Sequence, residues 1–182
     1  MIRIASVLAL TAMLMLPATA RAQDADGPAL ITVTGKIGTP NRGGLDPFMD
    51  AYFNFQQKDF GKARTFTFAE LKALPQRTVT ANAEGWPGPV MATGPLLKDV
   101  MSAAGVNEDA TVAFTAIDGY TVELDKAARA EQPWILAIEA GRKPLPLGGR
   151  GPAWLLHATG GAAVPSDEEA RWVWSIILVE AK

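Results

Sequence analysis

Residues 110–124 have the sequence ATVAFTAIDGYTVEL, which contains the clearest structural signal in the chain. Two segments rich in β-branched and aromatic residues, Ala110–Ile117 and Tyr120–Leu124, flank the dipeptide Asp118-Gly119. An Asp-Gly pair between two such segments favours a tight β-hairpin turn. The stretch therefore predicts two antiparallel strands, because strands joined by so short a turn cannot run parallel.

The segments on either side of this hairpin are also short. Strands are predicted over Ala29–Ile37, Thr65–Phe68, Arg77–Ala83, Trp134–Glu139, Ala153–His157 and Arg171–Val179. Helices are predicted over Phe68–Leu74, Pro95–Ala104 and Asp125–Glu131, the first from a capping box formed by Thr67 and Glu70. Many short strands with a few short helices, outside any regular βαβ alternation, indicate an α+β fold with one domain.

The composition narrows the possible functions. The protein has 182 residues, of which 48% are hydrophobic and 20% are charged, with no cysteine and one histidine. The absence of cysteine excludes disulfides, iron–sulfur clusters, thiolate metal sites and cysteine nucleophiles. A single histidine excludes zinc sites built on two histidines. The formal net charge of −2 argues against a general nucleic-acid binder.

The first residues have the features of an export signal. Arg3 is followed by an apolar run over residues 4–16, by Pro17 and by the small-x-small sequence Ala20-Arg21-Ala22. This order predicts a signal peptide over residues 1–22 that is cleaved after Ala22, rather than a membrane anchor. We therefore expect a mature domain over residues 23–182 in the periplasm, or outside a cell that has one membrane.

General catalytic motifs are missing from the sequence. There is no GxSxG elbow, no P-loop and no HExxH motif. A Ser–His–Asp triad would have to use His157, with Ser102, Ser166 or Ser175 as the nucleophile, and none of these serines is expected in a strained turn. The carboxylate run Asp167–Glu169 is typical of a solvated turn.

Five blocks occur in an order that a known family shares. They are FTFAELKALPQRTVTANAEGWPGP (66–89), TGPLLKDVMSAAGV (93–106), FTAIDGYTVELDKA (114–127), AIEAGRKPLPLGGRGPAWLLH (137–157) and RWVWSIILVE (171–180). This order resembles the molybdopterin-binding, sulfite-oxidase-like domain, and most closely its small exported members. The resemblance covers nearly all of residues 23–182 and implies a single mixed, mostly antiparallel α+β fold.

The chain departs from the catalytic members of that family at one position. They hold molybdenum with a cysteine near the end of the strand matched here by Arg77–Ala83, where this chain has Ala81, Asn82 and Ala83. Small exported members that lack the cysteine are similar to periplasmic pterin-binding proteins that signal to a membrane diguanylate cyclase/phosphodiesterase. The resemblance thus implies a non-catalytic protein of cyclic di-GMP signalling. It would bind a reduced pterin rather than molybdopterin, bind no metal, and contact the periplasmic domain of a membrane partner.

Two other functions stay open at this stage. One is a molybdopterin-dependent oxidoreductase with atypical metal ligation. The other is a structural or interaction domain with an unused cleft. The aromatic segment Phe48–Phe60 is equally consistent with a partner surface and with core packing.

The chemistry of a pterin indicates which side chains to look for. Its guanine-like edge offers a donor pair to a carboxylate and an acceptor pair to an arginine, and its flat bicycle stacks on an aromatic ring. Trp86 and Glu84, in the Gly- and Pro-containing loop Glu84–Pro89, are the first candidates. Trp86 is as consistent with packing over the sheet edge, and Glu84 with a solvated turn.

Five further candidates complete the predicted site. Arg150 lies between glycines, where it would either bond to the acceptor pair of the pterin or form part of a simple turn. Arg171 matches the family pattern Arg-x-x-Trp. Tyr120 could stack on the ligand or donate a hydrogen bond to it. Asp118 is explained by its place in the Asp-Gly turn, and ligand binding is the second interpretation. His157 is either a structural residue or a contact of the ligand. Trp172 and Trp174 are expected on one face of the last strand, with one lining the cleft while the other packs.

Overall fold

The computed structural model describes residues 27–182, so the predicted signal peptide lies outside the described part. The strands are β1 (Ala29–Gly35), β2 (Arg42–Gly43), β3 (Lys62–Thr67), β4 (Gln76–Ala83), β5 (Val90–Pro95), β6 (Val112–Ala116), β7 (Thr121–Leu124), β8 (Ile135–Ala137), β9 (Glu139–Ala140), β10 (Lys143–Pro144), β11 (Trp154–Leu156), β12 (Ala163–Val164) and β13 (Ile176–Ala181). The helices are α1 (Ala51–Phe55), α2 (Phe68–Ala73), α3 (Leu97–Ala103), α4 (Lys126–Glu131) and α5 (Ser166–Glu169). Among these helices, none has the length and apolar character needed to cross a membrane.

The first sheet has the order β2-β3-β1-β13-β6-β7. β1 and β13 pair in parallel, whereas the other neighbours in this sheet are antiparallel. The predicted hairpin is present as β6 and β7, and Gly119 at its turn has a positive φ of 89°. Glycine adopts this conformation without a steric penalty, which explains why the Asp-Gly signal predicts this turn correctly.

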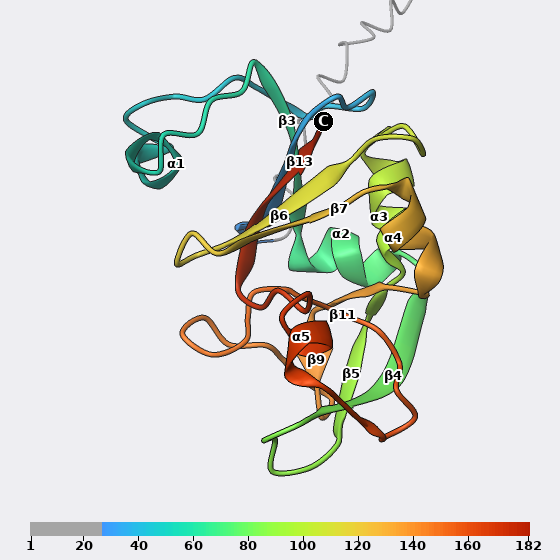
Figure 1. Ribbon diagram of the computed structural model, residues 1–182. Coiled ribbons are helices and arrows are strands. Elements are labelled where there is room, and N and C mark those ends of the chain that lie inside the picture. Colours follow the sequence, from blue (N-terminus) through green and yellow to red (C-terminus); the bar gives the residue numbers. More distant parts are fainter. Residues whose placement is uncertain (1–26) are drawn as a thin grey trace, which may run out of the picture.

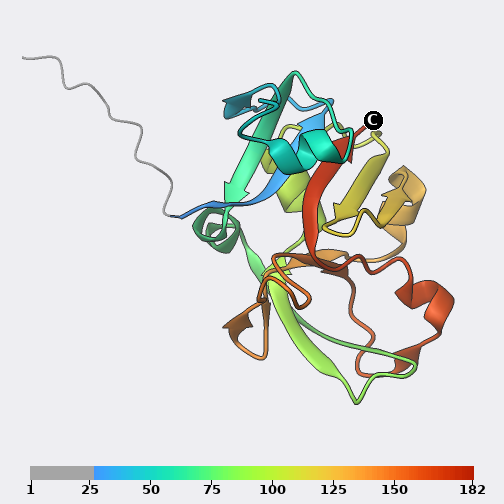
Figure 2. The same cartoon turned by 90° about the vertical axis from the view of Figure 1, so that its left-hand side faces the viewer.

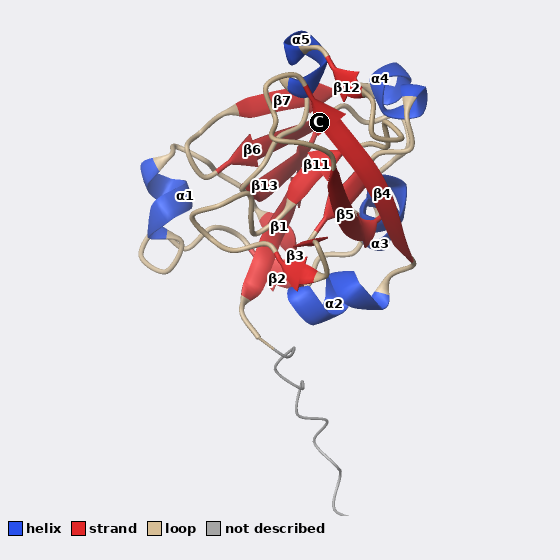
Figure 3. Ribbon diagram, turned by 90° about the horizontal axis from the view of Figure 1, so that it is seen from below, coloured by secondary structure: helices blue, strands red, loops and turns tan. Residues whose placement is uncertain are grey.

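The second sheet has the order β10-β9-β5-β4-β12 and extends away from the first (Figures 1 and 2). β4 and β5 form a long antiparallel hairpin, so residues 84–89 are its connecting loop. β12 pairs in parallel with the end of β4, which brings residues 163–164 beside Asn82 and Ala83. A two-stranded sheet of β8 and β11 lies between the two larger sheets in the core. Mixed sheets with a few short peripheral helices agree with the predicted α+β class (Figure 3).

Strand β5 was not predicted from the sequence. Its six residues end at Pro95 and include Gly94, a composition that disfavours a strand. The structure shows why glycine is needed there, since a Cβ at Gly94 would lie 2.0 Å from the carbonyl oxygen of Leu136 in β8. The close approach of the two backbones therefore requires glycine at position 94, and no local sequence pattern indicates this contact.

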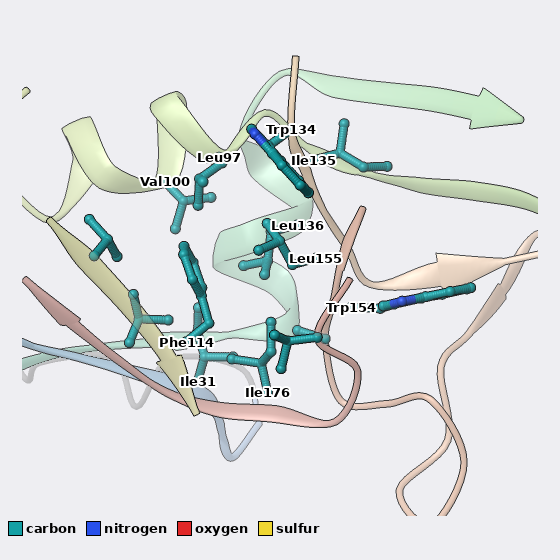
Figure 4. Close-up of a cluster of buried hydrophobic side chains, with 14 of the residues drawn as sticks. Ile31, Leu97, Val100, Phe114, Trp134, Ile135, Leu136, Trp154, Leu155 and Ile176 are labelled. Atoms are coloured by element: carbon teal, nitrogen blue, oxygen red, sulfur yellow. The ribbon is translucent and has the colours of Figure 1, made fainter. Parts of the chain in front are cut away.

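One hydrophobic core joins the sheets. Phe114 from β6, Ile176 from β13 and Leu136 from β8 lie fully buried in it, and Val100 from α3 packs on them (Figure 4). α2 begins with the predicted capping box, in which Thr67 and Glu70 bond reciprocally. The short helices thus cover a core that is built mainly from strands.

The prediction for the C-terminal region was partly wrong. The last strand is Ile176–Ala181 rather than Arg171–Val179, and the carboxylate run after Pro165 forms helix α5 instead of a solvated turn. Acidic residues in a first helical turn interact favourably with its unpaired N–H groups. Trp172 and Trp174 precede β13 in irregular chain, so strand alternation does not apply to them. Trp172 is buried, whereas Trp174 is 44% exposed.

Candidate functional site

Four consecutive residues, at the end of α5 and directly after it, each bond to a distant segment of the chain. The contacts are Glu168 Oε1 to His157 Nε2 (3.0 Å), Glu169 Oε1 to Trp86 Nε1 (2.7 Å), Ala170 O to the Tyr120 hydroxyl (2.7 Å) and Arg171 Nη1 to Glu131 Oε2 (3.0 Å). Four of the residues proposed from the sequence are therefore gathered around α5: Trp86, Tyr120, His157 and Arg171.

A glycine turn and strand β12 place α5 beside these segments. Gly160 and Gly161 have positive φ angles of 65° and 93°, which let the chain reverse before β12 joins the end of β4. The Asn82 side chain donates to the Gly161 carbonyl at 3.1 Å and anchors the turn. Pro165 then precedes the first turn of α5. The location of α5 thus depends on pairing between segments about 80 residues apart.

On one side of α5 lies a continuous set of ring contacts, which we name the indole cluster: Trp86, Trp134, Trp154, Trp172 and His157. Successive ring centroids, in the order Trp154, Trp86, Trp172, His157 and Trp134, are 5.3, 5.8, 5.1 and 5.0 Å apart. Most of these pairs meet edge to face, an arrangement that stabilises aromatic pairs beyond their buried area. The cluster is closed, because Trp134, Trp154, Trp172 and His157 are all buried.

Arg150 packs against the indole cluster rather than standing free in a glycine loop. Its guanidinium carbon lies 4.7 Å from the Trp86 ring centroid and 4.4 Å from that of Trp154. Burial lowers the pKa of Arg150 below its usual value, while the nearby Glu169 carboxylate acts in the opposite direction. Cation–π contacts of this kind contribute about 0.5–2 kcal/mol each. Arg150 is thus held by two indole faces and stays charged next to Glu169.

On another side of α5 lies an open hollow of about 390 Å³, which we name the aromatic pocket. It is lined by Ala116, Asp118, Tyr120, Ser166, Glu169, Ala170, Trp172 and Trp174. Tyr120 is 49% exposed, and together with Trp174 it offers accessible ring surface beside two carboxylates. A small concave site with aromatic walls and a few polar groups is the usual form of a small-molecule site.

A second hollow of about 330 Å³ includes His157, Glu168 and Arg171 among its lining residues. Its lining contains no aromatic ring other than the imidazole of His157. That ring is buried between the indoles of Trp134 and Trp172, and its Nε2 already faces Glu168. Arg171 likewise packs over Trp134, 5.3 Å from the ring centroid. His157 and Arg171 therefore support the fold around α5 instead of facing the aromatic pocket.

Glu84 is separate from both groups. It lies exposed in the β4–β5 loop, and its backbone N–H, rather than its carboxylate, donates to the Val164 carbonyl at 2.9 Å. Asp118 and Tyr120, in contrast, line the aromatic pocket, and Asp118 Oδ1 accepts the Tyr120 N–H as a turn residue would. Of the proposed residues, Asp118 and Tyr120 thus form part of one accessible site.

Sequence reasoning missed the two polar members Ser166 and Glu169 of that site, besides Ala116 and Ala170. Glu169 was assigned to a solvated run of charges, and Ser166 was considered only as a nucleophile. Their position follows from α5, which no local signal predicted. Trp174 was identified as one of two candidates to line the cleft, and its exposure distinguishes it from the buried Trp172.

The position matched to the molybdenum-ligating cysteine offers no suitable donor. Ala81 and Ala83 are buried, and the Asn82 amide is engaged with Gly161 and with the Ala83 N–H. Throughout residues 27–182, no group of three or more His, Cys, Asp or Glu side chains is arranged to hold a metal ion. Molybdenum prefers soft thiolate ligands, and the buried alanines and the engaged amide at this position supply none, so the residues present there do not fit the metal.

Comparisons with known proteins give one informative result. No protein-family model matches the chain, and no curated protein matches it. Among solved structures, the sulfane dehydrogenase SoxCD from Paracoccus pantotrophus is similar, with a TM-score of 0.56 and 17% sequence identity. The match covers 84% of this chain but only 38% of that one. The likeness shows that this chain and part of that protein share a fold, which agrees with the fold that the order of the sequence blocks predicts.

Proposed function

We propose that this protein is a periplasmic, non-catalytic pterin-binding protein that relays pterin occupancy to a membrane diguanylate cyclase/phosphodiesterase. The observation that carries the proposal is the aromatic pocket, where two accessible rings stand beside two carboxylates. The signalling partner and the periplasmic location come from the sequence resemblance and the predicted signal peptide.

The pocket offers the interactions that a pterin needs. Its bicycle would stack on Trp174 or Tyr120, by analogy with base stacking on aromatic side chains, which contributes about 1–3 kcal/mol per base. The Glu169 or Asp118 carboxylate would accept hydrogen bonds from the 2-amino group and N3–H, as a carboxylate does with a pair of adjacent donors. Arg150 lies outside this lining, so its effect on a ligand would pass through Glu169.

The charge of the pocket favours a simple reduced pterin over molybdopterin. The pocket-lining residues include two acids, and neither lysine nor arginine is among them. A phosphate-bearing ligand would have to place its negative charge near Asp118 and Glu169 with no lysine or arginine in the pocket lining, which is unfavourable. The missing thiolate points in the same direction, because it removes the protein's own ligand to molybdenum.

A molybdopterin-dependent oxidoreductase with atypical ligation is the second candidate. The likeness to a sulfane dehydrogenase favours it, since that protein has the same fold over most of this chain. This candidate requires stoichiometric molybdenum bound without any cysteine.

One preparation tests both candidates. The chain would be expressed with its N-terminal segment, purified from the periplasm and analysed for molybdenum and for released fluorescent pterin. We expect pterin without molybdenum, and calorimetric titration of the emptied protein with a tetrahydropterin should give saturable binding. Stoichiometric molybdenum would favour the oxidoreductase. Absence of both groups, together with no affinity in the titration, would leave a structural or interaction domain.

A further inference from the structure

Exposed apolar side chains are concentrated on one side of the molecule. The large hydrophobic residues that are exposed among residues 27–182 are Phe48, Met49, Tyr52, Phe55, Met91, Ile117, Tyr120, Leu147 and Trp174. All except Met91 belong to the segment around α1, the β6–β7 turn, the loop before β11 or the chain before β13. We name these eight residues the apolar band.

Hydrogen bonds join the segments of the apolar band to one another. The Tyr52 hydroxyl donates to the Ile117 carbonyl, which ties α1 to the β6–β7 turn. The Ile117 N–H donates to the Ser175 carbonyl at 3.0 Å, and the Ser175 hydroxyl donates to the Gly149 carbonyl at 2.8 Å. Figure 1 shows α1, the β6–β7 turn and the orange loop around residue 147 on the same side, which faces the viewer in Figure 2. The segments that carry the band are therefore tied to one another on one side of the molecule.

The part of the band around α1 is not a piece of the core. α1 has five residues and none of them is buried. Phe48 is 85% exposed and Phe55 is 81% exposed, while Phe60, at the end of the aromatic segment, packs inward. Of the two interpretations of Phe48–Phe60, core packing therefore fails for most of its aromatic residues. Several large apolar side chains exposed on one short segment are typical of an interaction site.

The charge beside the band indicates the chemistry of its partner. Around α1, Arg42 and Lys58 are each paired with a carboxylate, from Asp50 and Glu180 respectively. Arg150, in the loop that carries Leu147, packs over the Trp86 and Trp154 rings beside Glu169. Asp46 and Asp118 lie exposed next to Phe48 and Ile117, so the charge left at the rim around α1 and the β6–β7 turn is negative. An anionic lipid surface, or a second copy docked face to face, would meet like charge there. A protein surface with basic residues around an apolar centre is complementary.

We propose that the apolar band is the docking surface for a protein partner with an apolar centre and a rim of lysine or arginine. Tyr120 and Trp174 belong both to this band and to the aromatic pocket, so a ligand stacked in the pocket changes the surface that the partner meets. The assignment of the partner as the membrane signalling protein rests on the proposed function, whereas the surface itself does not.

Site-specific photo-crosslinking in the native host tests the surface. The photoreactive amino acid p-benzoylphenylalanine would replace Phe55, and, as a matched control, Met91, which is 52% exposed but outside the band. At Phe55 we expect a light-dependent product with a membrane protein whose crosslinked peptide, identified by mass spectrometry, carries lysine or arginine. The control position should give at least about fivefold less product, as expected for a localised interface.

A charge variant tests the second half of the proposal. Asp46→Asn removes a rim charge but keeps the side-chain oxygen that accepts the Phe48 and Met49 N–H groups, and it leaves Asp118 of the aromatic pocket unchanged. We expect the crosslinked product at Phe55 to fall by about fivefold or more, because electrostatic attraction mainly accelerates association. A product between two copies of the chain, equal yields at both positions, no product at Phe55, or no effect of the charge variant would each overturn the proposal.

Titration with a tetrahydropterin separates this proposal from the proposed function. The Phe55 and charge-neutral variants are measured beside the unmodified chain. A crosslink to the basic partner without pterin binding would leave the docking surface standing and reject the pterin function. Pterin binding without the crosslink would support the pterin function and reject the docking surface.

Discussion

The indole cluster and the aromatic pocket lie against α5 and are built from the same kinds of residue. Each places aromatic rings beside Glu169 of α5, yet they differ in how much of the ring surface stays accessible. Trp86 donates to Glu169 and stacks with Arg150, whereas Tyr120 and Trp174 keep nearly half of their surface free. The residue types therefore indicate which interactions a site can make. The exposure of their side chains indicates whether a ligand can reach them or whether they already pack within the protein.

Trp154→Ala is the change with the largest expected effect, and it acts on the closed side. Trp154 is fully buried, so its truncation should lower the free energy of unfolding by about 3–5 kcal/mol through lost burial and a cavity. Urea denaturation followed by circular dichroism measures this change. Trp174→Ala is the matched control and should cost less than about 1 kcal/mol. Equal losses for the two variants would remove the distinction between a structural cluster and an open pocket.

Trp174→Ala should have its main effect on ligand affinity. Loss of one stacking face, about 1–3 kcal/mol, corresponds to a roughly 5- to 160-fold weaker dissociation constant for a tetrahydropterin. Isothermal titration calorimetry gives this value directly. Met91→Ala, another exposed apolar residue, should leave the affinity unchanged. An unaltered affinity in the Trp174 variant would move the pterin away from the aromatic pocket.

Two neighbouring carboxylates of α5 allow a sharper comparison. Glu169→Gln keeps an oxygen that accepts the Trp86 N–H, but it removes a charge that lines the aromatic pocket. A hydrogen bond to a charged group contributes about 1.5–3 kcal/mol, so we expect at least a roughly tenfold loss of pterin affinity. Glu168→Gln faces His157 in the other hollow and should leave the affinity unchanged. Equal losses from both substitutions would indicate an indirect effect through α5.

The sequence predicts those parts of the molecule that depend on local signals. The β6–β7 hairpin, the capping box of α2 and the helix after Pro95 each follow from residues within a few positions of one another. β5 escapes prediction because Gly94 is fixed by the backbone of Leu136, which lies far along the chain. Glu169 escapes for a similar reason: its role depends on the pairing of β12 with β4.

The candidate site divides in the same way. Tyr120 and Asp118 were found because the turn that carries them is visible in the sequence. Trp86, Arg150, His157 and Arg171 were predicted as members of the same pterin site, and the structure packs them in or against the indole cluster. The glycine-flanked sequence around Arg150 does not indicate that its guanidinium packs on two indole rings.

The smallest expected effect is that of Glu84→Gln, which tests the carboxylate that the sequence predicts as a ligand of the pterin. Glu84 is exposed, and its carboxylate lines neither the indole cluster nor the aromatic pocket. Its substitution should change the unfolding free energy by less than about 0.5 kcal/mol and leave pterin affinity unaltered in the same two assays. A loss as large as that of Glu169→Gln would instead locate the ligand at the β4–β5 loop. Trp86 would then be the stacking ring, and the indole cluster would be a site that opens rather than a closed part of the fold.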